Sequence, residues 1–222
     1  MLFNEQLFRF EIHRTCDGNY LFLDIHHIVA DGTSLGIILN DINRAYSGEK
    51  LEVEEYTSYD LALDNRDALA SDAYKNAENY YKSVFENKGG SINFYPDKSG
   101  AAPTAEMYHR ETSEFSVQDV KAFCKKHGIT ENVFFISAFG ITLGKYNFRK
   151  DAVFTTIYHG RNDSRLSDTV GMLVKTLPVY CDFSGSTADC LNAVQQQLIN
   201  SMNNDIYPVS YTHLRAHETC AD

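Results

Sequence analysis

The sequence predicts an α/β fold arranged in two lobes, and three observations support this prediction. Segments of strand-like composition alternate with segments in which apolar residues recur at helical spacing. Residues 88–107 interrupt this alternation with Gly, Pro and Ser and predict a connection between lobes. The chain has 222 residues, of which 43% are hydrophobic, enough to form the cores that two lobes require. We therefore expect one lobe within residues 1–87 and another within residues 108–208.

A β-hairpin and a helix are predicted near the start of the chain. Residues 7–12 and 20–26 favour β-strands, and a Gly/Asn turn signal separates them. Apolar residues recur at helical spacing from Leu35 to Tyr46, behind Thr33 and Ser34, which can cap the first turn. The second strand and the helix should therefore meet at a rigid junction.

The rest of the chain carries comparable signals. Runs of Val, Thr, Ile and Tyr are typical of strands, and Gly128 is a natural helix stop. The expected elements are helical segments at 58–87, 116–127, 131–146 and 187–202, and strands at 151–159 and 173–183.

Composition argues against several classes of protein. The formal net charge is −10 and the basic residues are scattered, which argues against a nucleic-acid partner. The most apolar stretch, residues 133–143, is too short to cross a bilayer, and residues 1–5 do not resemble a secretory leader. Five widely spaced cysteines without a Cys-x-x-Cys pair argue against a disulfide framework and a zinc site. We expect a cytoplasmic protein without a membrane partner.

The run His26-His27-Ile28-Val29-Ala30-Asp31-Gly32 is the strongest chemical signal. Chance would produce this pattern about once per thousand sequences of such composition. If the extended geometry of the strand continues, alternation places His27 on the face of Leu23 and Ile25, and His26 on the opposite face. An imidazole, with an ordinary pKa of about 6.5, can accept a proton from an attacking amine or hydroxyl. The run therefore suits acyl transfer.

Asp31 and Gly32 have different expected roles. Asp31 can cap the following helix or pair with a distant arginine. Gly32 suits a sharp turn that needs positive φ or close backbone approach. Two alternatives remain: the histidines are incidental to a turn and cap, or His27 and Asp31 bind a metal, for which a third ligand is missing nearby. The sequence contains no nucleophile elbow or phosphate-binding loop, so the acyl donor must arrive activated.

The motif resembles the His-His-x-x-x-Asp-Gly run of the condensation-domain superfamily, which includes the condensation domains of nonribosomal peptide synthetases and the chloramphenicol acetyltransferases. Three further runs resemble family segments in the same order: Tyr56-Thr57-Ser58-Tyr59, His159-Gly160-Arg161 and Val170-Gly171-Met172-Leu173-Val174-Lys175-Thr176-Leu177-Pro178. Lys175 stands where the family usually has Asn, and Leu173 where Phe is common. Order and spacing resemble the synthetase domains more than the compact acetyltransferases.

The resemblance implies a chloramphenicol acetyltransferase-like two-lobed fold, of which this chain holds the later part of the first lobe and the early part of the second. It implies that His27 is the main catalytic histidine, with His26 beside it. Asp31 and Gly32 would be structural, and Arg161 would pair with Asp31 across the lobes. Because neither lobe is complete, we expect the chain by itself to be inactive.

The resemblance also implies the partners. The parent enzyme would join an acyl or peptidyl thioester to an aminoacyl acceptor, each carried on the phosphopantetheine of a peptidyl carrier domain, beside an adenylation domain. No cofactor or metal would bind directly. Epimerisation, a stand-alone acyltransferase that uses coenzyme A, and a non-catalytic recruitment platform stay open as alternatives.

Two further expectations limit the number of candidate site residues. The tyrosines near positions 58 and 80 are expected to pack rather than to catalyse. Residues 209–219 resemble a translated sequencing adapter, so we interpret residues 209–222 as a non-biological tail. That interpretation removes His213 and His217, which have the helical spacing of a metal pair.

Overall fold

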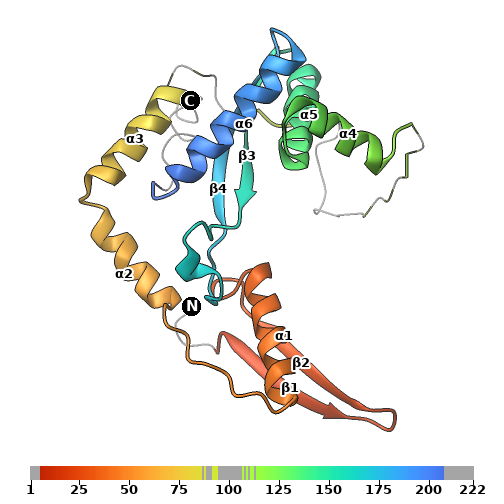
Figure 1. Cartoon of the computed structure of the whole chain (residues 1–222), viewed down its shortest axis with the longest axis vertical. Coiled ribbons are helices and arrows are strands. Elements are labelled where there is room, and N and C mark those ends of the chain that lie inside the picture. Colours follow the sequence, from red (N-terminus) through yellow and green to blue (C-terminus); the bar gives the residue numbers. More distant parts are fainter. Residues whose placement is uncertain are drawn as a thin grey trace, which may run out of the picture. The chain divides into compact units, whose positions relative to one another are not determined.

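The structure is a computed structural model that describes residues 6–86, 88, 92–94, 107, 109, 111–112 and 114–207 (Figure 1). Two compact units are present. The first combines the chain up to Tyr74 with Tyr158–Lys175, and the second combines Lys75–Ile157 with the chain from Thr176 onward. Each unit is described separately below.

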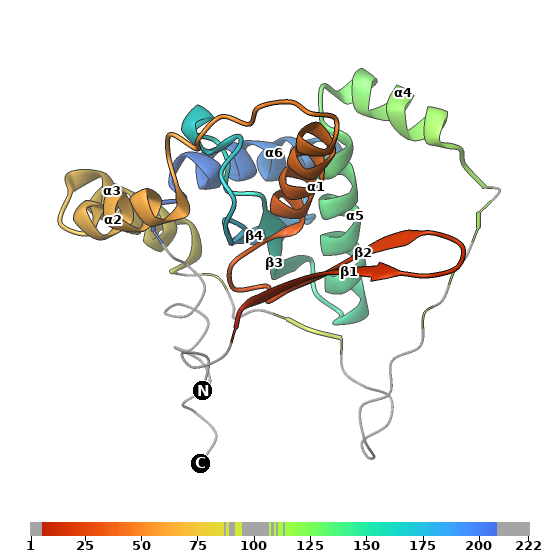
Figure 2. The same ribbon diagram turned by 90° about the horizontal axis from the view of Figure 1, so that it is seen from below.

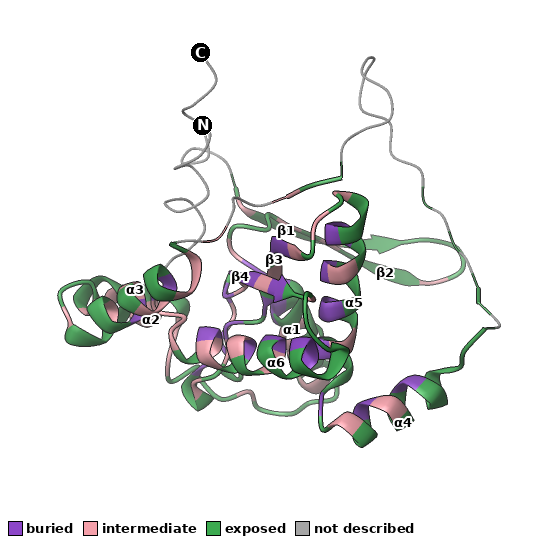
Figure 3. Ribbon diagram, turned by 90° about the horizontal axis from the view of Figure 1, so that it is seen from above, coloured by how far each residue is buried: buried purple, intermediate pink, exposed green. Residues whose placement is uncertain are grey.

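The first unit opens with the predicted hairpin. Strand β1 (Phe8–Arg14) pairs antiparallel with β2 (Asn19–Ile25), and the Thr15 N–H donates to the Gly18 carbonyl oxygen at 2.8 Å to close the turn. Figure 2 shows the two strands as a long ribbon. Large apolar side chains along this ribbon stay exposed, and Figure 3 shows exposed residues along much of its length. The most exposed on one face are Phe8, Phe10, Ile12 and Leu21.

Helix α1 (Gly32–Tyr46) follows the hairpin as predicted, and of the predicted caps it uses Asp31 in place of Thr33 or Ser34. The N-cap residue is Asp31, whose carboxylate accepts from the Ser34 N–H at 2.8 Å. Thr33 and Ser34 lie inside the helix. Asp31 is the residue that caps the helix because its backbone is extended, as a cap requires, with φ of −98° and ψ of −177°. The helix therefore begins three residues earlier than its apolar periodicity indicates.

The helical segment 58–87 is two helices instead of one. Helix α2 (Ser58–Ala68) begins with a capping box formed by Thr57 and Asp60. Helix α3 (Asp72–Phe85) begins after Ser71, whose hydroxyl donates to the Ala68 carbonyl oxygen at 2.6 Å and accepts from the Tyr74 N–H at 3.1 Å. Ser71 thus ends one helix and starts the next, a local competition that composition does not reveal.

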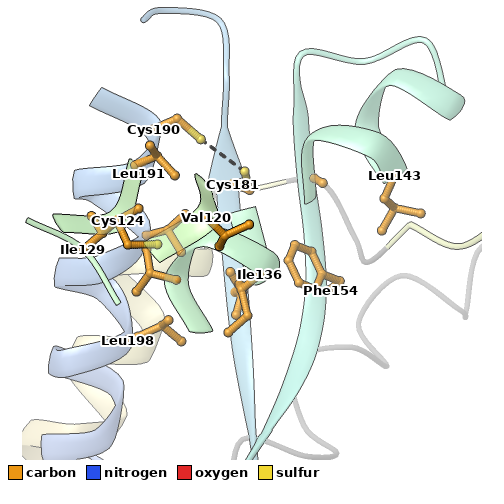
Figure 4. Packing of buried hydrophobic residues seen from close by; sticks show 14 residues of the cluster. Val120, Cys124, Ile129, Ile136, Leu143, Phe154, Cys181, Cys190, Leu191 and Leu198 are labelled. Carbon is orange, nitrogen blue, oxygen red and sulfur yellow. Dashed lines mark hydrogen bonds between the residues drawn. The ribbon is translucent and has the colours of Figure 1, made fainter. Parts of the chain in front are cut away.

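The second unit contains the main core. Strands β3 (Asp151–Tyr158) and β4 (Lys175–Asp182) pair, and helices α4 (Val117–His127), α5 (Glu131–Tyr146) and α6 (Thr187–Asn203) pack with them. These five elements match the predicted ones to within two residues at either end. Figure 4 shows their buried side chains. The core residues include Val120, Cys124, Val133, Ile136, Leu143, Phe154, Val179, Cys181, Cys190, Leu191, Val194 and Leu198.

Tyr80 and Tyr81 connect α3 to α6 within this unit, which confirms the prediction that they pack. Tyr81 is fully buried, and its hydroxyl donates to the Ser201 carbonyl oxygen at 3.0 Å. The Tyr80 hydroxyl donates to the Gln197 carbonyl oxygen at 3.2 Å. Burial raises the pKa of both tyrosines. Both phenols therefore stay neutral and serve as hydrogen-bonded core residues.

Two sequence predictions fall mostly on residues outside the described ones. Of the predicted connection 88–107, the structure describes residues 88, 92–94 and 107, and the Ile92 N–H donates to the Val153 carbonyl oxygen at 3.0 Å. The predicted tail 209–222 lies wholly outside them. The lobe boundaries stay a prediction, and the compact units differ from them because Tyr158–Lys175 groups with the amino-terminal part. None of the described helices is long and apolar enough to span a bilayer.

Candidate active site

The two histidines lie in a turn rather than on a strand. Strand β2 ends at Ile25, and the Val29 N–H donates to the His26 carbonyl oxygen at 3.1 Å. The His26 N–H still donates to the Leu7 carbonyl oxygen at 2.8 Å, but the turn begins at His27, so strand alternation cannot decide which face His27 occupies. That part of the sequence argument is wrong. Both histidines are exposed.

Hydrogen bonding distinguishes the two rings. Nδ1 of His26 accepts from the Ile28 N–H at 3.0 Å, so this ring stabilises its own turn. The His27 ring, in the middle of the same turn, has no hydrogen-bond partner among the described residues. His27 is therefore the ring that is free to contact a substrate.

Asp31 is the hub of the junction and is almost completely buried, with 1% of its surface exposed. Its Oδ1 accepts from the Ser34 N–H at 2.8 Å, the Ser34 hydroxyl at 2.9 Å and Nη2 of Arg161 at 3.0 Å. Its Oδ2 accepts from Nη1 of Arg161 at 2.7 Å and the Leu173 N–H at 3.1 Å. A carboxylate has about four lone-pair positions, so no capacity remains to orient His27. Asp31 both caps α1 and pairs with an arginine, the two roles that the residues alone left open.

Arg161 forms the ion pair that the resemblance implies, 130 positions along the chain from Asp31. Both amino groups of its guanidinium contact the carboxylate, and its side chain is 5% exposed. Nη2 also donates to the Thr169 carbonyl oxygen at 3.2 Å, and Nη1 to the His159 carbonyl oxygen at 3.3 Å. Asp31 and Arg161 lie in the same compact unit. The pair therefore fastens the segment after β3 to the start of α1.

Ser34 is the residue that sequence reasoning missed. It is fully buried, and its hydroxyl oxygen accepts from the Gly171 N–H at 3.0 Å and from Nη2 of Arg161 at 3.2 Å. The hydroxyl proton lies within reach of both Asp31 Oδ1 and the Gly171 carbonyl oxygen, at 2.9 and 2.8 Å. The available signal was that Ser34 lies three residues after Asp31, but the sequence predicts Ser34 only as a helix cap. Ser34 instead joins the histidine run to the Val170–Pro178 run.

The close backbone approach that was predicted for Gly32 occurs at Gly160. Gly32 does not have positive φ, and a Cβ on it meets nothing within 4 Å, so the prediction of a sharp turn or close approach there is wrong. As the first residue of α1 it follows the Asp31 cap with ordinary helical geometry. Gly160 has φ of 70°, and a Cβ on it lies 1.9 Å from the Leu173 carbonyl oxygen. The close approach is therefore in the second motif.

Of the two tyrosines near position 58, Tyr56 packs as predicted and Tyr59 does not. The Tyr56 hydroxyl donates to Asp64 Oδ2 at 2.6 Å, and the guanidinium of Arg165 stacks on its ring at 4.3 Å. Burial, together with the neighbouring Asp64 carboxylate, raises the pKa of Tyr56 to about 12. A phenol that is neutral at pH 7 and already donates its proton is poorly suited to catalysis. Tyr59 is 71% exposed.

The carboxyl of Asp31 has a lowered pKa. Burial by itself raises this pKa, but the hydrogen bonds from Arg161, Ser34 and the Leu173 N–H outweigh it. The folded-state pKa therefore lies well below the unfolded value of about 3.9. Asp31 contributes stability that is complete above that unfolded value and is lost as the pH falls toward the folded-state pKa.

This linkage predicts how Asp31→Asn compares with the unsubstituted chain across pH. The difference in unfolding free energy should be constant from neutral pH to about pH 5 and should shrink below about pH 4. Urea unfolding of both proteins at each pH measures it, because the other acidic groups cancel in the difference. A difference that stays unchanged down to about pH 2 contradicts the lowered pKa of Asp31.

Two other kinds of site lie elsewhere or lack support. Within the described part of the chain, no group of three or more His, Cys, Asp and Glu side chains is placed to hold a metal, and Asp31 has no free oxygen to share with His27. A pocket of about 660 Å³ in the first unit lies between the later part of α1, residues 51–56 and residues 164–169. None of His26, His27, Asp31 and Arg161 lines it.

Known proteins are similar to this chain in sequence and in fold. The family model described as Condensation domain matches residues 1–217. Bacitracin synthase 2 of Bacillus licheniformis is 28% identical over 195 residues, covering 85% of this chain and 7% of that protein. The first condensation domain of the calcium-dependent antibiotic synthetase, solved in complex with substrate analogue 3a, has a TM-score of 0.69 at 18% identity over 90% of this chain and 47% of its own.

A second solved structure, the complex of the X-domain and OxyB from teicoplanin biosynthesis, has a TM-score of 0.72 at 16% identity, covering 93% of this chain and 49% of that one. The chain thus spans about half the length of these solved domains. The structural matches show the condensation-domain fold, of which this chain covers a part. Because the family model matches nearly the whole sequence, including the histidine run and the buried Asp31–Arg161 pair that braces it, the chain belongs to the condensation-domain family.

Proposed function

We propose that the parent domain of this chain forms amide bonds between carrier-bound substrates in nonribosomal peptide biosynthesis, with His27 as its catalytic residue. The observation that supports this most is the division of labour at the junction. Asp31 and Arg161 are buried and paired with each other, and Asp31 is saturated with hydrogen bonds, whereas the exposed His27 ring has no hydrogen-bond partner among the described residues. A braced loop that presents one free imidazole suits proton transfer to or from a bound substrate.

The proposed step is an acyl transfer. The amine nitrogen of the acceptor attacks the thioester carbonyl of the donor, a C–N bond forms and the C–S bond breaks. His27 takes the proton that the amine loses and can return it to the departing thiolate, so charge and atoms balance. Much of the rate should come from holding the two reactants together, because the thioester is already activated.

Asp31 acts through position only. Its oxygens are occupied by Arg161, Ser34 and the Leu173 N–H, so it cannot hold a tautomer of His27 as the carboxylate of a catalytic triad does. Its contribution is to keep the turn that carries His27 fixed against the segment around Gly171, to which the Asp31 N–H donates at 3.3 Å. Asp31 is therefore a positioning residue.

The proposed partners follow from the same reaction. Donor and acceptor arrive on the phosphopantetheine arms of two peptidyl carrier domains, and an adjacent adenylation domain loads them. The chain itself binds no resident cofactor in this proposal, and the enzyme works in the cytoplasm. Bacitracin synthase 2 supports the proposal of neighbouring domains, because the segment similar to this chain is only 7% of that protein.

The test replaces His27 with Ala in the full-length parent protein. With loaded carrier domains, we expect amide formation to fall by about 10² to 10⁴ fold, the usual contribution of a general base. Product is measured by mass spectrometry of the carrier-bound peptide. The matched control is His13→Ala, since His13 is an exposed histidine whose ring contacts Glu11 and Phe22 of the same hairpin. Unchanged turnover in His27→Ala would remove the catalytic assignment.

A non-catalytic recruitment platform is the second candidate, because a domain of this fold has been solved in complex with another protein, OxyB. The same assay separates the two functions. If the parent forms no amide but retains carrier binding in a pull-down with purified carrier domains, recruitment is favoured. Chiral analysis of the product tests epimerisation, and replacing the donor carrier with acyl-coenzyme A tests the stand-alone alternative.

A further inference from the structure

Cys181 and Cys190 form a pair of thiols in the core of the second unit, apart from the candidate active site. Both are free, and they are 0% and 2% exposed. Their sulfur atoms lie 3.3 Å apart, and Figure 4 shows the two side chains facing each other, one from β4 and one from α6. Neither thiol has a role in the proposed acyl transfer.

The surrounding core restricts where Cys181 can point. Helix α5 approaches β4 so closely that a Cβ on Gly140 lies 2.8 Å from Cβ of Cys181 and 3.0 Å from its sulfur. Among the described residues, the Cys181 thiol also lies within reach of one carbonyl oxygen, that of Ser137, at 4.0 Å. A side chain confined on this side cannot easily move away from Cys190. The pairing is therefore held by helix packing.

The two thiols differ in acidity. The hydrogen bond with Cys190 raises the pKa of Cys181, and burial raises it further. The hydrogen bond from Cys181 lowers the pKa of Cys190 and outweighs burial. Cys190 also lies in the first turn of α6, where the helix dipole favours a negative charge. Because Cys190 lies in this first turn, next to exposed residues 184–189, it is the thiol that we expect to attack.

We propose that Cys181 and Cys190 are a site of reversible oxidation, at which a disulfide of the glutathione class converts the pair into an intramolecular disulfide. The Cys190 thiolate attacks one sulfur of oxidised glutathione and releases a glutathione thiolate. Cys181, after losing its proton to that thiolate or to solvent, attacks the Cys190 sulfur and releases the second glutathione. The pair is oxidised by two electrons, and one oxidised glutathione becomes two reduced molecules.

Access to the pair is through the segment that links the two cysteines. Residues 184–189, immediately before Cys190, are exposed, and they contain the end of the loop and the first turn of α6. Helix ends open more readily than helix centres, so a small oxidant reaches Cys190 when this turn frays. To form the disulfide, the two sulfur atoms must approach from 3.3 Å to about 2.05 Å, which is a short movement.

The test treats the folded full chain with oxidised glutathione, alkylates the remaining thiols after unfolding, and maps the peptides by mass spectrometry. We expect a cross-linked peptide that joins Cys181 to Cys190 and disappears after dithiothreitol. Cys190→Ser should lose the cross-link completely and leave Cys181 alkylated. Cys124→Ser is the matched control, because Cys124 is a buried thiol of the same core at 4% exposure, and this variant should keep the cross-link.

Three outcomes overturn the proposal. One is full alkylation of both cysteines after oxidation of the folded chain, while the exposed Cys16 carries glutathione. Another is a cross-link that forms only in denaturant. Alkylation of both thiols before oxidation at the same rate with and without denaturant also counts against it, because the two sulfurs are then not buried together.

Discussion

Arg161→Met is expected to lower the free energy of unfolding by about 3–5 kcal/mol, the usual cost of removing one partner of a buried ion pair. The substitution leaves the Asp31 carboxylate buried at 1% exposure without its guanidinium. It also removes the donor to the Thr169 carbonyl oxygen, which lies in the same segment. Urea unfolding followed by circular dichroism measures the change.

A double-mutant cycle shows whether the loss comes from the unpaired charge. Arg161→Met combined with Asp31→Asn should be less destabilised than the sum of the two single variants, because the double variant buries no unpaired carboxylate. Arg165→Met is the matched control. Arg165 also pairs with an aspartate, Asp163, but its side chain is 55% exposed, so we expect a loss of at most about 1 kcal/mol. Equal losses of unfolding free energy in Arg161→Met and Arg165→Met would contradict a stabilising role for the buried Asp31–Arg161 pair.

Gly160→Ala is expected to destabilise the chain by about 3 kcal/mol or more. An alanine with φ of 70° is strained by about 1–2 kcal/mol. The added Cβ also lies 1.9 Å from the Leu173 carbonyl oxygen, so the backbone of Leu173 must move. That movement weakens the hydrogen bond from the Leu173 N–H to Asp31. The loss is measured from the urea midpoint, and the Asp31→Asn background should reduce it because that bond is then already weakened.

Gly32→Ala is the control for the glycine prediction. Nothing lies within 4 Å of the Cβ position, and the residue is helical, so stability should stay within about 0.5 kcal/mol or rise slightly. A large loss at Gly32 with none at Gly160 reverses the assignment of the close approach to the second motif.

Local signals predicted the helices of the second unit well. Ser116 and Asp119 form the capping box that begins α4, and Gly128 ends the helix with φ of 65°. These signals lie within a few residues of the element that they define. The break between α2 and α3 was missed because Ser71 competes for the same backbone groups that a continuous helix uses.

The candidate site could be predicted only in part. The resemblance of the His26–Gly32 and His159–Arg161 runs implied the Asp31–Arg161 pair, which the structure contains. Strand alternation could not distinguish His27 from His26, because β2 ends at Ile25. The choice of His27 now rests on the hydrogen bond that Nδ1 of His26 accepts from the Ile28 N–H. The catalytic role of His27 stays a prediction.

The sequence by itself determined the hairpin, the helix that follows it and the residue types at their junction, because strand composition, apolar periodicity and caps act over a few residues. Only the tertiary structure decided that Asp31 caps α1 and binds Arg161 simultaneously, that Ser34 joins the two motifs, and that Gly160, not Gly32, is the close approach. The Asp31–Arg161 and Ser34–Gly171 contacts join residues more than 100 positions apart, and their geometry depends on how the segment after β3 lies against α1. Sequence patterns that act over a few residues cannot predict contacts between residues so far apart in the chain.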